Sequence, residues 1–121
     1  RGIIHAEAPT KDFVKKRGEL EGIQLWLNLP AKYKMITPHY QHLEKEQIPF
    51  IISEDKKVQL NIVAGNQKDI LGNIKTQTSV NVFTVNSEEN GEMEIELPKN
   101  HQSLIYLLDG EISVNNSNGN I

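Results

Sequence analysis

The chain has 121 residues, 37% of them hydrophobic, which is enough for the modest core of one small domain. Its 13 basic and 16 acidic residues give a net charge of −3 and are spread along the chain, so no basic face is expected to bind nucleic acid directly. The absence of cysteine excludes disulfides, thiolate nucleophiles and zinc–thiolate sites. No apolar run approaches the roughly 20 residues of a membrane-spanning helix and no signal peptide is evident, so we expect a cytoplasmic protein without membrane association.

The first candidate chemistry is in the apolar stretch at residues 2–7, which carries His5 and Glu7. If this stretch is a strand, residues two apart share a face, so the imidazole and the carboxylate would converge. Such a pair could supply two ligands of a site for a first-row divalent metal such as iron. By spacing alone, a polar strand face that contacts water is the more common explanation, and two ligands are too few for a tight site.

Strong alternation marks residues 23–29, where four aliphatic residues occupy every second position before Pro30. A period of two predicts a strand with one apolar face. Trp26 falls on the opposite face, and we expect it to pack in a core or against a neighbouring domain. The next segment, residues 37–46, has a plausible N-cap at Thr37 followed by proline and good helix formers, and it predicts a short connector helix that Pro49 stops.

The second half of the chain is dominated by further strand signals. Alternation predicts strands at residues 58–63, 80–85, 93–97, 104–108 and 111–114. Asn90 and Gly91 suit a tight turn between the second and third of these strands. Glu92, Glu94 and Glu96 form an acidic row, which we interpret as the solvated face of an edge strand. The sequence therefore predicts an all-β, antiparallel meander.

The other histidines offer no convincing second set of ligands. His39 and His42 lie three apart on the predicted connector helix, which is more typical of a solvated face than of a metal pair. His101 stands alone before a predicted strand. No histidine has an aspartate or serine at a distance that indicates a catalytic triad.

Several motifs occur in an order that resembles the pirin family of two-barrel cupin proteins. The most specific is Gly-Ile-Gln-Leu-Trp-Leu-Asn-Leu at residues 22–29. The others lie at residues 1–7, 34–35, 38–41, 48–49, 58–65 and 97–110. The resemblance covers nearly the whole chain and implies a cupin-like antiparallel β-barrel or sandwich with a short connector helix. Because the chain starts at Arg1 and ends in an Asn-rich run, we interpret it as a piece of a longer protein.

The resemblance also implies a domain organisation and a metal site. Residues 1–30 would be the remnant of the N-terminal barrel, residues 31–50 the connector, and residues 51–121 a partial C-terminal barrel. In the family, the first barrel binds one metal, usually iron, through a His-x-His pair and a later histidine and glutamate two residues apart. His5 and Glu7 match the later pair, whereas the earlier pair would precede Arg1. We therefore expect iron in the full-length protein and none in this chain alone.

Two classes of function follow from the resemblance. The parent protein could be an iron-dependent quercetin 2,3-dioxygenase, in which Glu7 takes the hydroxyl proton of a flavonol-like substrate. Alternatively, it could be a non-enzymatic, metal-dependent regulator that binds a transcription factor or a metabolic enzyme. A plain β module with a decayed site is a third reading. A strand at residues 23–29 without neighbours would expose an apolar row, so we also expect a homodimer through exposed strands.

Overall fold

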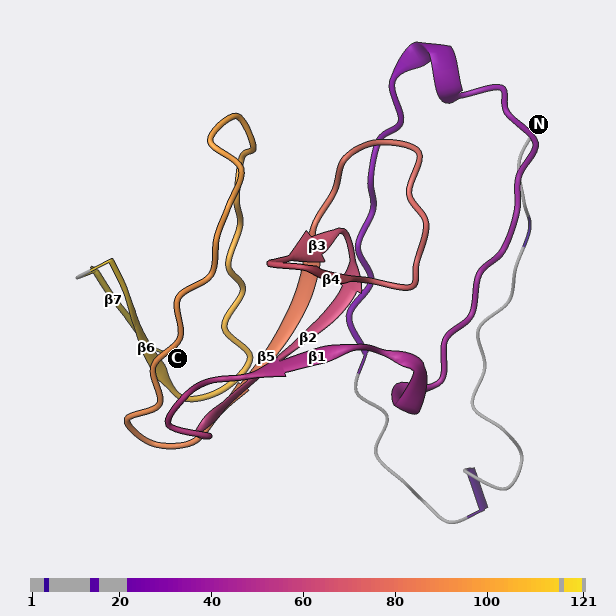
Figure 1. Ribbon diagram of the computed structural model, residues 1–121. Coiled ribbons are helices and arrows are strands. Elements are labelled where there is room, and N and C mark those ends of the chain that lie inside the picture. Colours follow the sequence, from indigo (N-terminus) through magenta and orange to yellow (C-terminus); the bar gives the residue numbers. More distant parts are fainter. Residues whose placement is uncertain (1–3, 5–13, 16–21, 116, 121) are drawn as a thin grey trace.

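The computed structural model describes residues 4, 14–15, 22–115 and 117–120 (Figure 1). It contains strands β1 (Phe50–Ile52), β2 (Val58–Ala64), β3 (Asn66–Gln67), β4 (Ile70–Leu71), β5 (Val82–Ser87), β6 (Glu111–Val114) and β7 (Ser117–Asn120). Two single turns of 3-10 helix, η1 (Ala31–Tyr33) and η2 (Lys45–Gln47), precede them. The strands form antiparallel sheets in the orders β1-β2-β5, β3-β4 and β6-β7. The predicted all-β, antiparallel fold is confirmed.

Strand β2 is the centre of the core. Its residues alternate strictly between buried and half-buried, and the side chains of Leu60 and Ile62 are fully buried. Val58 and Ala64 complete the buried row. Val58, Leu60 and Ile62 each contribute about 1.5–3 kcal/mol when their side chains leave water, so this row holds the three-stranded sheet together. The strand predicted at residues 58–63 is confirmed.

Antiparallel pairing joins β2 to a strand on each side. Leu60 lies opposite Ile51 of β1 and opposite Val85 of β5. The register between β2 and β5 shifts between Ile62 and Ala64, where β2 carries an irregularity. This arrangement confirms the strand predicted around residues 80–85, which the structure places at Val82–Ser87.

The turn after β5 also has the predicted form. The Gly91 amide donates to the Glu88 carbonyl over 3.1 Å. Asn90 adopts a φ of 57°, in the left-handed region that asparagine tolerates better than most residues. The chain then continues into residues 92–97, which are extended but form no strand ladder with another described segment.

Residues 92–97 are attached to the sheet by hydrogen bonds from side chains. Gln67 in β3 is 2% exposed, and with its amide oriented by its partners it bonds both backbone groups of Glu96. The nitrogen donates to the Glu96 carbonyl over 3.1 Å and the oxygen accepts from the Glu96 amide over 2.8 Å. At the other end, the Glu92 amide donates to Asp55 Oδ2 over 3.3 Å. Two side chains thus replace a strand ladder.

The connector helix predicted at residues 37–46 is wrong. Residues 37–44 are extended, and helical structure is limited there to η2. Gln41 explains the difference: its amide donates to the Lys75 carbonyl over 2.8 Å and accepts from the Lys75 amide over 2.8 Å, which fixes the segment beside residue 75. A helix of ten residues is marginal on its own, so these tertiary bonds prevail over the local helix signals.

Three predicted strands are extended but lack a ladder in the part of the chain that the structure describes: residues 23–29, 93–97 and 104–108. Their apolar side chains are largely exposed, with Leu25 at 57% and Leu104 at 86%. Trp26 is 85% exposed, so the expectation that it packs in a core is wrong, while its contact with a neighbouring domain stays a prediction. No helix among the described residues is long and apolar enough to cross a membrane.

Candidate functional site

The predicted metal ligands His5 and Glu7 lie outside the described residues. Their assignment therefore stays a prediction that rests on the sequence. Among the residues that the structure does describe, no group of three or more His, Asp or Glu side chains is placed to hold a metal ion.

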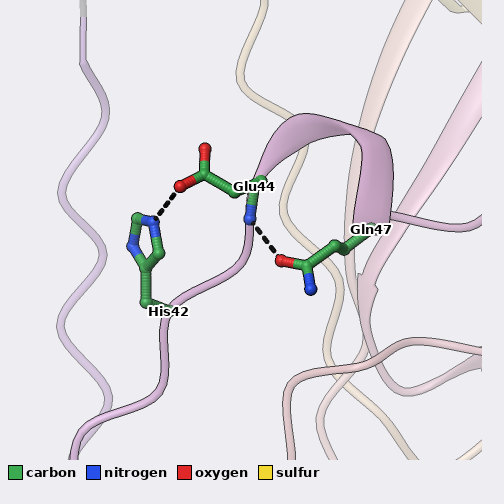
Figure 2. A network of polar contacts seen from close by, with 3 residues as sticks. All are labelled: His42, Glu44 and Gln47. Carbon is green, nitrogen blue, oxygen red and sulfur yellow. Dashed lines mark hydrogen bonds and ion pairs between the residues drawn. The ribbon is translucent and has the colours of Figure 1, made fainter.

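His42 belongs to a small polar network at the start of η2 (Figure 2). Its Nε2 lies 3.0 Å from Glu44 Oε1, and the two side chains are 62% and 71% exposed. The Glu44 amide donates to the Gln47 side-chain oxygen over 2.8 Å, which satisfies a backbone donor at the first turn of η2. Ion pairs this exposed contribute little to stability, so the network mainly shapes the chain where it enters η2.

The extended backbone next to this network allows Tyr40 and His42 to stack. Tyr40 and His42 stack with ring centroids 6.5 Å apart and planes 11° from parallel. Residues two apart share a face in an extended chain, whereas a helix would point them in different directions. His39 is placed on the other face, where its Nε2 lies 3.4 Å from the Gln41 side-chain nitrogen. The two histidines are thus separated by the same geometry that excludes the helix.

Asp55 is a described carboxylate whose pKa is shifted by its hydrogen bonds. Its side chain accepts hydrogen bonds from the Ser53 hydroxyl, from the Lys57 amide at 3.0 Å and from the Glu92 amide. The Ser53 hydroxyl contributes most and the Lys57 amide next to lowering the pKa of Asp55 below its ordinary value. Asp55 is exposed at the β1–β2 turn, and its contacts indicate a structural role that joins this turn to residue 92.

The acidic row and His101 lie where the sequence suggested. Glu92, Glu94 and Glu96 are all exposed, which agrees with a solvated strand face. His101 is half-buried, and its amide donates to the Pro98 carbonyl over 3.0 Å in the turn that follows this segment.

The side chains that organise the described structure are Gln41, Asp55 and Gln67, and sequence reasoning missed all three. Each bonds backbone groups of a residue at least 29 positions away in the chain: Lys75, Glu92 and Glu96, respectively. Local patterns carry no signal for such pairings, since a glutamine in a strand or an extended segment is equally compatible with solvent.

Known proteins match the chain over most of its length. A Pseudomonas aeruginosa protein, provisionally named as a quercetin 2,3-dioxygenase, is 33% identical over 113 residues, which cover 93% of this chain and 40% of the relative. "Pirin-like protein 2" of Arabidopsis thaliana is 30% identical over 109 residues, covering 90% of this chain and 32% of the relative. Human "Pirin" is 29% identical over 114 residues, covering 94% of this chain and 37% of the relative.

The chain therefore spans 40% or less of the length of each of these three relatives. No protein-family model matches it, and no solved structure matches it. The antiparallel sheets agree with the cupin-like fold of pirin proteins. With several pirin relatives aligned over about nine-tenths of its length, the chain belongs to the pirin family.

Proposed function

We propose that this chain is part of a metal-binding pirin-like protein that acts as an iron-dependent quercetin 2,3-dioxygenase. The observation that carries the proposal is the 33% identity, over 93% of the chain, to a Pseudomonas aeruginosa protein provisionally named for that activity. In this proposal residues 1–30 belong to the first cupin barrel, residues 31–50 connect the barrels, and residues 51–121 form part of the second.

His5 and Glu7 have the donor chemistry that ferrous iron accepts, a neutral imidazole and a carboxylate. They supply only two ligands, and the described residues offer no cluster that would complete the set. The proposal therefore assigns the remaining ligands to the part of the protein that the longer relatives possess and this chain does not span. When bound, the iron would supply the oxygen chemistry, and the Glu7 carboxylate would accept the proton of a flavonol hydroxyl.

The test begins with iron content, measured by elemental analysis at known protein concentration. We expect about one iron per chain in a protein of the relatives' length that carries this sequence, and much less than one in the 121-residue chain. The variants His5→Ala and Glu7→Ala should each lower the iron content of the long protein. The matched control Glu44→Ala removes an exposed carboxylate that pairs with His42 and caps η2, and it should leave the iron content unchanged.

Activity is tested by oxygen consumption with quercetin. The iron-loaded long protein should consume oxygen, and Glu7→Gln should lose most of that activity because its amide cannot take the proton. Stoichiometric iron in Glu7→Ala, or turnover unaffected by Glu7→Gln, would reject the assigned roles.

A second candidate function is regulation through a protein partner. It is favoured by the exposed apolar side chains of residues 104–108, where Leu104 is 86% and Tyr106 76% exposed. Such exposure is typical of a surface that the rest of the second barrel or another protein covers. Iron binding without any oxygen consumption on flavonols would favour this candidate over the enzyme.

A further inference from the structure

Two extended segments of the chain present complementary surfaces to solvent. Residues 22–34 contain no acidic residue and carry Lys32 and Lys34, whereas residues 88–97 contain five glutamates and no basic residue. Both segments carry an alternating aliphatic row. In Figure 1 the two segments run apart from each other, and no hydrogen bond between described residues joins them.

The backbone of residues 92–97 has one attached side and one open side. The amide of Glu92 and both backbone groups of Glu96 point towards Asp55 and Gln67, which hold the segment on the sheet. In an extended chain the backbone groups of alternate residues point in opposite directions, so those of Met93 and Ile95 face away from the sheet. Among the described residues, none donates to or accepts from these two backbones.

Residues 22–29 are an extended segment of the same kind. Their backbone forms no hydrogen bond with another described residue. The aliphatic side chains of Ile23, Leu25 and Leu27 are 66%, 57% and 55% exposed. The Lys34 ammonium donates to the Asn28 side-chain oxygen, which draws the basic turn at η1 towards the end of this segment.

We propose that residues 22–29 of one copy of the chain add as a strand to the open edge of residues 92–97 of a second copy. Antiparallel pairing of Leu25 with Ile95 would align the two aliphatic rows. It would also bring η1, which carries Lys32, to the end of the edge where the turn with Glu88 and Glu89 lies, whereas parallel pairing would carry the lysines away from these glutamates. Two such contacts related by a two-fold axis close a dimer.

The acidic row selects the partner strand in this arrangement. Pairing of the acidic edge with its own copy would bring Glu92, Glu94 and Glu96 against like charges, which is unfavourable. A neutral strand followed by two lysines has no such penalty. Backbone hydrogen bonds and the apolar rows would supply the affinity, and the charges would set the direction.

Charge reversal tests the proposal on the whole 121-residue chain by sedimentation equilibrium at low ionic strength. The wild-type chain of 13.7 kDa should have a dimer mass near twice that value. The double variants Lys32→Glu/Lys34→Glu and Glu88→Lys/Glu89→Lys should each weaken self-association by about tenfold or more, as roughly 1.4 kcal/mol per tenfold change implies for lost charge pairs. An equimolar mixture of the two variants should again form dimers.

The mixture also shows that both variants are folded, since only intact edges can pair again. The control Lys45→Glu/Glu54→Lys reverses two exposed charges outside both segments and should dimerise like the wild type. Added salt should weaken association, because exposed charges are screened. A monomeric wild-type chain at about 100 μM would overturn the proposal, and so would dimerisation that neither double variant weakens.

Discussion

Gln67 and Glu96 are joined by two hydrogen bonds, from the Gln67 amide nitrogen to the Glu96 carbonyl and from the Glu96 amide to the Gln67 amide oxygen. The glutamine side chain therefore offers Glu96 the donor and acceptor that a neighbouring strand would otherwise provide. Gln67 is 2% exposed, so on the side that faces Gln67 water cannot readily replace these two hydrogen bonds to Glu96.

Replacement of Gln67 by alanine should destabilise the chain by about 2 kcal/mol, because it removes two hydrogen bonds to the Glu96 backbone that each contribute about 1 kcal/mol. Urea unfolding at pH 7 measures the change. The Glu96 amide should also lose its protection from hydrogen exchange by NMR. The control Gln102→Ala alters an exposed glutamine and should stay within about 0.5 kcal/mol of wild type. Unchanged exchange at Glu96 in Gln67→Ala would contradict the pairing.

Gln41→Ala should cost about 1 kcal/mol, because both hydrogen bonds to Lys75 are lost at a partly solvated position. The substitution should also release residues 37–44 from their extended path. Circular dichroism would then register a small gain of helix, since the local helix signals are no longer opposed. Gln77→Ala, in an exposed loop position, is the matched control. A stability equal to wild type in Gln41→Ala would show that other contacts hold the segment.

Asp55 should make stability depend on pH in the acid range. Its folded pKa is lowered below the ordinary value of 3.8 by the Ser53 hydroxyl and then by the Lys57 amide. The contribution of the ionised carboxylate is therefore complete above that value and is lost as the pH falls through the lower folded pKa.

The variant Asp55→Asn cannot ionise, so its deficit relative to wild type should be largest near pH 7 and shrink below pH 4. Urea midpoints at a series of pH values measure the difference. Asp69→Asn, in the turn between β3 and β4, is the control carboxylate. A deficit that is constant from pH 7 to pH 2 would exclude the carboxylate as its cause.

Gly65 and Gly110 allow backbone strain to be separated from steric collision. Both have positive φ values, 83° and 86°. A Cβ at Gly65 would lie 2.6 Å from the Val80 carbonyl oxygen and 2.8 Å from the Asn81 Cα, whereas a Cβ at Gly110 meets nothing within 4 Å. Gly110→Ala should thus cost about 1 kcal/mol for its conformation alone, and Gly65→Ala clearly more. Equal losses of thermal stability in the two variants would contradict the close approach of Val80 and Asn81, just before β5, to Gly65.

Periodicity predicted β2 well because both of its neighbours are present, so the aliphatic face that the sequence indicates is also the face that becomes buried. The same period at residues 23–29 predicts the extended backbone but not its exposure. Burial depends on a partner strand, and alternation carries no information about where that partner comes from.

At residues 37–46 of the connector, the sequence instead predicted the wrong backbone structure. Thr37 and Pro38 form a sound local start for a helix, yet a single glutamine bonded to residue 75 determines the path. The proposed ligands His5 and Glu7 could be named from the sequence only through the family resemblance, because a histidine and a glutamate two apart have no distinctive spacing of their own.

The attachment of residues 92–97 by Asp55 and Gln67 also predicts how this part of the chain would open. A ladder opens cooperatively with its sheet, whereas a segment held by two side chains can detach while β1, β2 and β5 remain paired. Cleavage by a protease under native conditions should therefore concentrate between residues 92 and 108, and the fragment that retains β2 should keep its slowly exchanging amides. The described chain would then have two regions that open separately, a stable three-stranded sheet and a less stable outer segment.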